Sequence, residues 1–356
     1  MINPILKEDF DFILADKLID WERFAGKTVL VTGASGFLPS YMIQTLLHFN
    51  SRKVQEPTRI IGLVRDLSKA KEKYADYLND DNLNLLVQDV STPFTIEDEV
   101  DFIIHAASQA SPKFFFSDPV GTINANTLGT THLLELAKEK KVKSFLYFST
   151  GEVNGDALDK LQVVNEDDYG AVDPLIIRNS YAESKRMGEN MCASWFAQYG
   201  VPAKIIRPSH TYGPGFSFDD GRAFTSFVAS VFNNKDIVLN SDGSAKRSFC
   251  YIADATRAYF LVLLNGENAN AYNVGNEYEI SIKELASLII EVSGKNNLKI
   301  VYPSNNNVQK SPSNTASHGL LGINKIKKLG WSPVFKEKEG FKRTLESLVR
   351  VGVQDE

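Results

Sequence analysis

The sequence predicts an α/β fold in which a Rossmann-type, doubly wound parallel sheet is followed by a smaller C-terminal α/β substrate lobe. Short apolar runs alternate with helical patterns through the first 207 residues, as in a parallel sheet covered by helices on both faces. The first apolar run ends directly in a glycine-containing turn. The chain has 356 residues, which is enough to bury a large core.

Six apolar runs predict the strands of the sheet, and the segments between them predict its helices. Residues 1–25 precede the first run and form an N-terminal extension with a mixed, partly amphipathic pattern. The expected strands are residues 27–32, 59–64, 83–88, 100–105, 143–149 and 203–207, and the expected helices are residues 38–48, 126–140 and 181–199.

The pattern changes after Pro208, where the chain becomes loop-rich and its later elements become shorter. A helix is expected over residues 280–293 and a strand over residues 299–302. We therefore predict a dinucleotide-binding domain over residues 26–207. Residues 208–356 would form most of the substrate-binding lobe, with part of 245–265 returning to the first domain.

Composition excludes several classes of function. Lys and Arg total 39 against 44 for Asp and Glu, a net charge of −5, so there is no basic excess for nucleic acid. Two cysteines, Cys192 and Cys250, cannot form a disulfide framework, which favours a reducing, cytoplasmic location. No apolar run approaches the ~20 residues of a membrane span, and the N-terminus lacks a signal-peptide pattern. We expect no metal site.

The turn Thr32-Gly-Ala-Ser-Gly-Phe-Leu-Pro39 lies between the first strand and the first helix. Gly33 and Gly36 would let the backbone approach a pyrophosphate at the helix N-terminus, which favours anions. Pro39 stands where a third glycine is usual, and proline is tolerated in a first helical turn. The turn predicts dinucleotide binding through Gly33, Ser35, Gly36, Phe37 and Leu38.

Residues at the ends of the next strands are candidates for the rest of this site, because the carboxyl ends of parallel strands share one edge of the sheet. Val64-Arg65-Asp66 offers both an acid for ribose hydroxyls and an arginine for a 2′-phosphate, so NAD and NADP both remain open. Asp89 and Val90 would face adenine. The small residues Ala106, Ala107 and Ser108 would permit close passage of the cofactor.

Tyr181 and Lys185 lie four residues apart in a predicted helix and therefore on one face of it. A phenol has a pKa of ~10, and a neighbouring ammonium lowers that value. The pair is thus suited to take a proton from an alcohol. Thr150, after the fifth strand, would hydrogen-bond the same hydroxyl, and Glu152 lies at the same edge of the sheet.

These motifs together resemble the extended short-chain dehydrogenase/reductases of the NAD-dependent epimerase/dehydratase family, which modify nucleotide sugars. The resemblance spans about residues 26–333. It includes His105-Ala-Ala-Ser108, Ser149-Thr150, Tyr181-x-x-x-Lys185, Arg207-Pro-Ser-His-Thr-Tyr-Gly-Pro214, Arg247-Ser-Phe-Cys-Tyr-Ile-x-Asp254, Tyr272-Asn-Val-Gly275 and Leu329-Gly-Trp-Ser-Pro333. It implies a bound NAD that takes a hydride from the sugar, and a catalytic set of Tyr181, Lys185 and Thr150. It also implies cofactor contacts from Asn126, Ser149, Tyr181, Lys185 and Pro208.

Within the family, the chain looks like the UDP-glucuronate decarboxylases. This likeness rests on Ser108-Gln-Ala-Ser-Pro112, Glu152, Asp168-Tyr-Gly170, Arg178 and Asp220-Gly-Arg222. It implies that oxidation at C4 precedes loss of the C5 carboxylate, that Glu152 assists proton handling, and that the substrate is bound by Ser111, Arg178, His210, Arg222 and Arg247.

Several positions depart from these patterns. Gly151 replaces the acid of 4,6-dehydratases, Asn154 replaces a usual tyrosine, and His210 a usual asparagine. Ser311 to His318 replace the Arg-x-Pro-Asp motif of decarboxylases. The alternatives are therefore a nucleotide-sugar 4,6-dehydratase, 4-epimerase or C4 dehydrogenase of surface-polysaccharide synthesis. A non-catalytic cofactor sensor is a further alternative, against which the retained Thr150, Tyr181 and Lys185 argue.

The resemblance also implies a homodimer that pairs the tyrosine-bearing helix and the helix before it. Met187, Met191 and Trp195 form an apolar stripe along the first of these helices. The same stripe is equally compatible with an intramolecular core.

Overall fold

The computed structural model describes residues 2–52, 54–302 and 320–348. Its centre is a seven-stranded parallel sheet in the order β12-β7-β5-β4-β1-β2-β3. The strands are β1 (Thr28–Thr32), β2 (Arg59–Val64), β3 (Leu83–Val87), β4 (Phe102–His105), β5 (Ser144–Phe148), β7 (Ala203–Pro208) and β12 (Ala271–Val274). The predicted fold class is confirmed, and all six predicted strands are present.

The seventh strand, β12, was not predicted. It is only four residues long and belongs to the loop-rich second half of the sequence, so its pattern alone is weak. Its pairing with β7 extends the sheet by one strand. From β1 the chain builds β2 and β3 on one side and then returns to build β4 on the other. This reversal creates a crevice at the carboxyl ends of β1 and β4, where ligands bind in such sheets.

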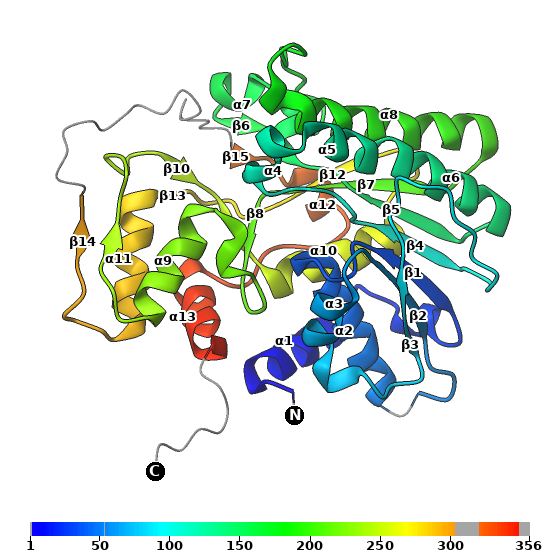
Figure 1. The fold of residues 1–356 in the computed structure, drawn as a ribbon, viewed down its shortest axis with the longest axis horizontal. Coiled ribbons are helices and arrows are strands. Elements are labelled where there is room, and N and C mark those ends of the chain that lie inside the picture. Colours follow the sequence, from blue (N-terminus) through cyan, green and yellow to red (C-terminus); the bar gives the residue numbers. More distant parts are fainter. Residues whose placement is uncertain (1, 53, 303–319, 349–356) are drawn as a thin grey trace.

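Helices cover both faces of the sheet (Figure 1). One face is covered by α2 (Phe37–Ser51) and α10 (Ile252–Asn265), with α1 (Pro4–Leu14) outside them. The other is covered by α5 (Pro119–Asn126), α6 (Leu128–Lys140) and α8 (Ser180–Tyr199). Successive residues of β1 alternate between the two cores, with Val29 and Val31 in one and Leu30 in the other. This alternation explains why every residue of the strand is buried.

The N-terminal extension joins the sheet to the lobe through one buried carboxylate. Asp9 of α1 accepts hydrogen bonds from the Tyr41 hydroxyl of α2 at 2.6 Å and from the Tyr251 hydroxyl at 2.7 Å. Arg343 of the C-terminal helix α13 (Glu337–Leu348) also donates to Asp9, at 2.6 Å. A buried carboxylate needs such partners, so residues 2–25 are an integral part of the packing.

The lobe lies beside the sheet and is built around α9 (Ala223–Phe232), α11 (Ile282–Ser293) and α13 (Figure 1). Its strand pairs are β8 (His210–Tyr212) with β11 (Phe249–Tyr251), β9 (Ile237–Val238) with β14 (Ile300–Val301), and β10 (Lys246–Arg247) with β13 (Ile280–Ser281). The predicted helix over 280–293 begins at Ile282, because Ser281 and Glu284 form a capping box. The predicted strand over 299–302 is reduced to β14.

The remaining elements are short and lie near the ends of the sheet. They are α3 (Leu67–Lys73), α4 (Pro112–Ser117), α7 (Ala157–Lys160), β6 (Val163–Val164), β15 (Leu320–Leu321) and α12 (Asn324–Lys327). β15 pairs with β6, and α12 contacts β12. Three elements from the second half of the chain, α10, β12 and α12, thus belong to the sheet or pack against it. The exact boundaries of the two proposed domains remain a prediction.

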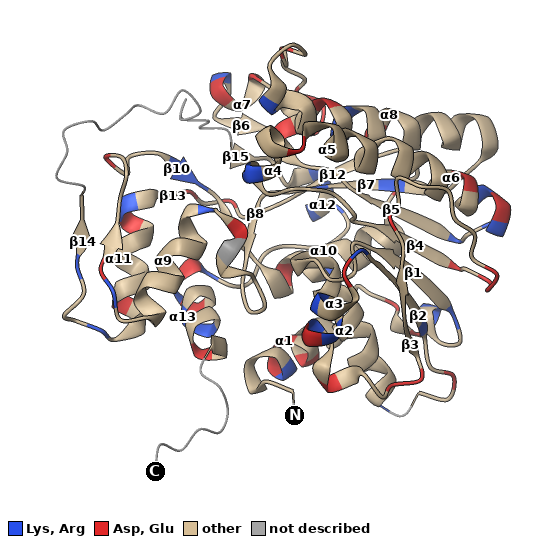
Figure 2. Ribbon diagram, in the orientation of Figure 1, with Lys and Arg blue, Asp and Glu red and all other residues tan. Residues whose placement is uncertain are grey.

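Acidic and basic residues are interspersed over the elements in the view of Figure 2. Within the described ranges, no helix combines the length and apolarity that a membrane crossing requires. Cys192 and Cys250 are both buried and unpaired.

Candidate active site

A cavity of about 1220 Å³ runs along the carboxyl ends of the strands and is closed on one side by the lobe. The structure brings nearly all of the predicted site residues to its wall. These are Gly33, Ser35, Gly36, Phe37, Leu38, Arg65, Asp89, Val90, Ala106, Ala107, Ser108, Ser111, Ser149, Thr150, Glu152, Arg178, Tyr181, Lys185, Pro208, His210, Arg222 and Arg247.

Asn126 is the exception among the predicted site residues. It is fully buried at the end of α5, and its side-chain nitrogen donates to the Ser184 hydroxyl of α8 at 3.0 Å. Asn126 is not among the residues that line the cavity, and its expected contact with the cofactor stays a prediction. Its observed contact fixes α5 against the helix that carries Tyr181.

The glycine turn fits a dinucleotide. Gly33 has a φ of 65°, and a Cβ at this position would lie 2.8 Å from the Ala107 Cα, so only glycine fits. The Gly36 amide donates to the Gly33 carbonyl at 2.7 Å and leads into α2. The Ser108 hydroxyl is buried at the cavity and has no hydrogen-bond partner among the described residues. A polar ligand such as a dinucleotide would satisfy this group.

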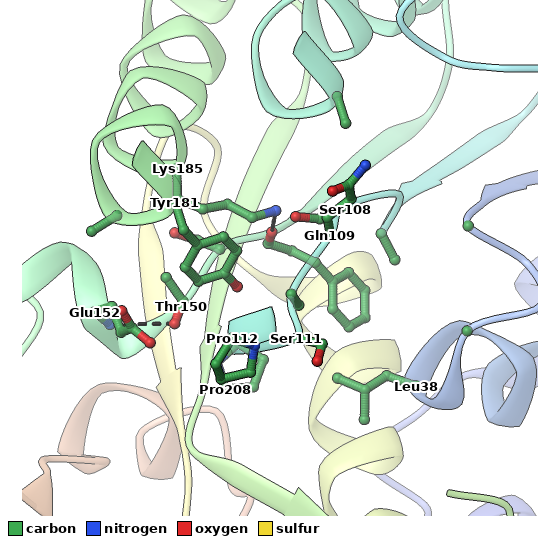
Figure 3. A pocket seen from close by; sticks show the side chains of 18 of the residues that line it. Leu38, Ser108, Gln109, Ser111, Pro112, Thr150, Glu152, Tyr181, Lys185 and Pro208 are labelled. Carbon is green, nitrogen blue, oxygen red and sulfur yellow. Dashed lines mark hydrogen bonds between the residues drawn. The ribbon is translucent and has the colours of Figure 1, made fainter. Parts of the chain in front are cut away.

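Tyr181 projects from the first turn of α8 into the cavity (Figure 3). Its ring stacks on Phe115 of α4 with centroids 4.7 Å apart, and its hydroxyl lies near the Thr150 side chain. Burial raises the pKa of Tyr181 above its ordinary value, and the negative charge of Glu152 adds to this rise. The Thr150 side chain and the charge of Arg222 oppose it. The phenol is therefore protonated and oriented in this state.

Lys185 lies one turn further along α8 and is 2% exposed. Its ammonium donates to the Phe148 carbonyl at 2.6 Å and lies 4.8 Å from the Tyr147 ring centroid (Figure 3). Burial lowers the pKa of Lys185 to about 7, although Glu189 opposes this shift. The sequence predicted that Lys185 lowers the pKa of Tyr181. In this state burial dominates the pKa of Tyr181 and the Lys185 ammonium donates to the end of β5, so the lowering by Lys185 stays a prediction.

Glu189, one further turn along α8, was not identified from the sequence. It accepts two hydrogen bonds from Arg207, at 2.8 and 2.7 Å, and one from the Ser149 hydroxyl. Arg207 itself is 1% exposed. The signal was available, because residues 181, 185 and 189 share one helix face. The buried pair fixes α8 against the ends of β5 and β7.

Glu152 and Arg178 form an ion pair at 2.9 Å, with each side chain about one-third exposed to the cavity (35% and 36%). Arg178 also lies over the Phe115 ring, 5.7 Å from its centroid. Tyr181 stacks on the same Phe115 ring, so the ion pair lies next to Tyr181. It places one negative and one positive group near the Tyr181 ring.

Gly151 packs against Leu321 of β15. A Cβ at position 151 would lie 3.1 Å from both methyl carbons of Leu321, so an acidic side chain at this position would displace them. The wall here is therefore apolar, in contrast to the acid that 4,6-dehydratases carry. Asn154 is buried and donates to the Asp168 carbonyl at 2.8 Å, so it holds the following loop.

Cations cluster at the lobe end of the cavity. Arg222 donates to Asp220 at 2.6 Å, and the Asp220 carbonyl accepts from the Ser111 hydroxyl at 2.8 Å. The His210 side chain lines the cavity and is exposed. Desolvation by the surrounding protein, together with the charges of Arg222 and Arg247, lowers its pKa. Lys246, which was not predicted, also lines this end. The cluster suits the diphosphate of a nucleotide.

No group of three or more His, Cys, Asp or Glu side chains within residues 2–52, 54–302 and 320–348 is arranged to hold a metal ion. The Ser311 to His318 segment, where the decarboxylase motif is missing, lies outside the described residues.

Known proteins with similar sequences belong to one enzyme family. The model of the NAD dependent epimerase/dehydratase family matches residues 29–275. UDP-glucuronic acid decarboxylase 6 of Arabidopsis thaliana is 32% identical over 91% of this chain and 90% of its own length. UDP-glucuronic acid decarboxylase 1 of Danio rerio is 30% identical over 91% of this chain and 73% of its own length.

Among solved structures, the UDP-glucuronic acid 4-epimerase of Bacillus cereus, in complex with UDP-glucuronic acid and NAD, superposes with a TM-score of 0.73. It covers 90% of this chain and 98% of its own, at 23% identity. This likeness supports the fold.

Proposed function

The chain belongs to the NAD-dependent epimerase/dehydratase family, and we propose that it oxidises C4 of a nucleotide sugar and decarboxylates a UDP-hexuronate. The resemblance noted in the sequence is confirmed at the level of this enzyme family, whose cofactor is NAD. The observation that carries the proposal is the Tyr181 hydroxyl, which lies near Thr150 in the cavity that the glycine turn opens.

When bound, NAD supplies the hydride acceptor for oxidation at C4. Tyr181 takes the proton of the sugar hydroxyl, and Thr150 orients that hydroxyl by a hydrogen bond. Because burial raises the pKa of Tyr181, the phenolate needs a nearby positive charge, and Lys185 supplies it from one turn away. The stacking of Tyr181 on Phe115 keeps the ring in place during transfer.

Oxidation at C4 makes the C5 carboxylate a β-keto acid, which loses carbon dioxide readily. Glu152 and Arg178 stand beside Tyr181, so Glu152, after taking up a proton from solvent, could pass it to C5 while Arg178 balances the charge of the carboxylate. Return of the hydride to C4, with the proton of Tyr181 going back to the C4 oxygen, would then restore the alcohol, so that the net reaction is loss of carbon dioxide alone. The names of the relatives support this net reaction. Gly151 argues against 4,6-dehydration, because this position carries no acid to protonate a C6 hydroxyl and packs against the apolar side chain of Leu321.

The deciding experiment incubates the purified protein and NAD with UDP-glucuronate, UDP-glucose and other nucleotide sugars, and analyses the products by mass spectrometry. We expect UDP-glucuronate to lose carbon dioxide and yield a UDP-pentose. Loss of water would instead indicate a dehydratase, an isomer of unchanged mass an epimerase, and a 4-keto product a dehydrogenase. Binding of NAD without turnover of any sugar would identify a sensor.

We also propose that the protein is a homodimer through α8 and the helices before it, α6 with the adjoining α5, which pack together on one face of the sheet (Figure 1). The three residues of the apolar stripe, Met187, Met191 and Trp195, differ in their exposure in the structure. Met191 is buried and Trp195 donates to Glu135, whereas Met187 is 52% exposed. Val120 of α5 is likewise 64% exposed. These apolar side chains support an interface there.

Replacing Met187 with glutamate is therefore expected to convert a dimer into a monomer in light scattering coupled to size-exclusion chromatography. A buried, unpaired charge at an apolar interface is strongly unfavourable. Tyr278→Ser, at an exposed position of the lobe, serves as the control and should leave the mass unchanged. A monomeric wild-type protein would refute the proposed interface.

We also propose a cytoplasmic location, which is supported by Cys192 and Cys250, both of which are free thiols in the structure.

A further inference from the structure

The end of β2 determines which adenosine ribose the cavity accepts. A carboxylate at this position ordinarily binds both ribose hydroxyls of NAD, and an arginine accommodates a 2′-phosphate. The chain has Arg65 and Asp66 here, and both line the cavity. The sequence leaves the choice open, whereas the contacts of the side chains distinguish the two residues.

The carboxylates at this end of the cavity are already engaged by their own loops. Asp66 accepts from the Lys69 amide at 3.1 Å as the cap of α3. Asp89 accepts from the Ser91 amide at 2.8 Å and from the Ser91 hydroxyl at 2.7 Å. Asp118 accepts from the side chain of Gln109 at 2.8 Å and from the Gly121 amide at 3.0 Å.

The cations at the same end are not engaged. Arg65 and Lys69 are both exposed and line the cavity, and α3 carries further lysines on its surface (Figure 2). Neither side chain has an ion-pair or hydrogen-bond partner in the part of the chain that the structure describes. Hydrogen bonds from Ser91 lower the pKa of Asp89 against the effect of burial, and those from Gln109 and Gly121 lower the pKa of Asp118. The charge of Arg65 adds to both effects, so Arg65 lies near both carboxylates at the wall of the cavity.

We infer that Arg65 and Lys69 form a subsite for a 2′-phosphate, so that the protein binds NADP in addition to NAD. The planar guanidinium of Arg65 offers two parallel N–H groups to the phosphate oxygens, and the Lys69 ammonium adds a second positive charge. Asp66 remains the cap of α3 and does not oppose the phosphate with a free carboxylate. This inference concerns cofactor binding alone and does not depend on the sugar or the net reaction.

The test measures binding without substrate, by titrating the protein with NADH and NADPH and following nucleotide fluorescence or heat. The wild type is expected to bind NADPH within about threefold of NADH, or more tightly. Arg65→Ala should weaken the binding of NADPH by about 10- to 100-fold and the binding of NADH by less than about threefold. Lys69→Ala should act in the same direction, with a smaller effect.

Lys71→Ala is the matched control, because Lys71 lies on the same helix but does not line the cavity. It should leave both affinities unchanged. The inference is overturned if the wild type binds NADPH more than about threefold more weakly than NADH. It is equally overturned if Arg65→Ala changes the ratio of the two affinities by less than about threefold. Arg65 is exposed, so the variant is expected to fold.

Discussion

Replacing Tyr181 with phenylalanine is expected to lower kcat by about 100- to 10 000-fold on the nucleotide sugar that the substrate panel identifies. The variant loses the group that exchanges a proton with the sugar hydroxyl. It keeps the ring, which still stacks on Phe115 as the tyrosine does. Because no contact with the substrate other than that of the hydroxyl is removed, KM should change by less than about threefold.

The control for this variant is Tyr199→Phe, at the exposed end of the same helix, which should retain wild-type kcat. Binding of NADH, followed by fluorescence, should be equal in both variants and in the wild type. A Tyr181→Phe protein with more than about a tenth of wild-type kcat would show that another group takes the proton. In that event Glu152, which lies close enough to shift the pKa of Tyr181, becomes the first candidate.

The sheet could be predicted because its signals are local. Most of the early strands are short apolar runs with both faces buried, as in β1 and β5, and a glycine turn marks the first crossover. β12 lacked such a signal, since its place in the sheet depends on pairing with β7, more than sixty residues earlier in the chain. The fold class thus followed from the periodicity of the first half, and the edge of the sheet did not.

The site shows the same division. Strand-end residues such as Thr150 and Ala107 were found because parallel strands gather their carboxyl ends at one edge of the sheet. The Leu321 wall was not found, because it requires β15 to pair with β6 across more than 150 residues. The lowered pKa of Lys185 could not be predicted from the sequence either. Spacing puts an ammonium beside a phenol, but only the packing reveals how strongly each group is buried.

Burial of Lys185 gives the second large effect, which we expect in the pH dependence of stability. The pKa of Lys185 falls to about 7 in the folded protein from an ordinary value of 10.5. Between these values the unfolded chain holds a proton that the folded chain has released. Stability therefore rises with pH across this interval. Lys185→Met removes the contribution, so the free energy of unfolding of the wild type should increase relative to that of the variant from pH 7 to pH 9.

Urea unfolding of both proteins at several pH values measures this difference. Lys204, whose pKa is also lowered, to about 8, titrates in both proteins and so cancels in the comparison. Parallel stability curves would mean that Lys185 keeps an ordinary pKa, and hence its charge, throughout this range. Lys185→Met should also lower kcat by about 100-fold or more, because it removes the positive charge that stabilises the Tyr181 phenolate. With a folded pKa near 7, Lys185 carries that charge only in part, and Glu189 favours its protonated form.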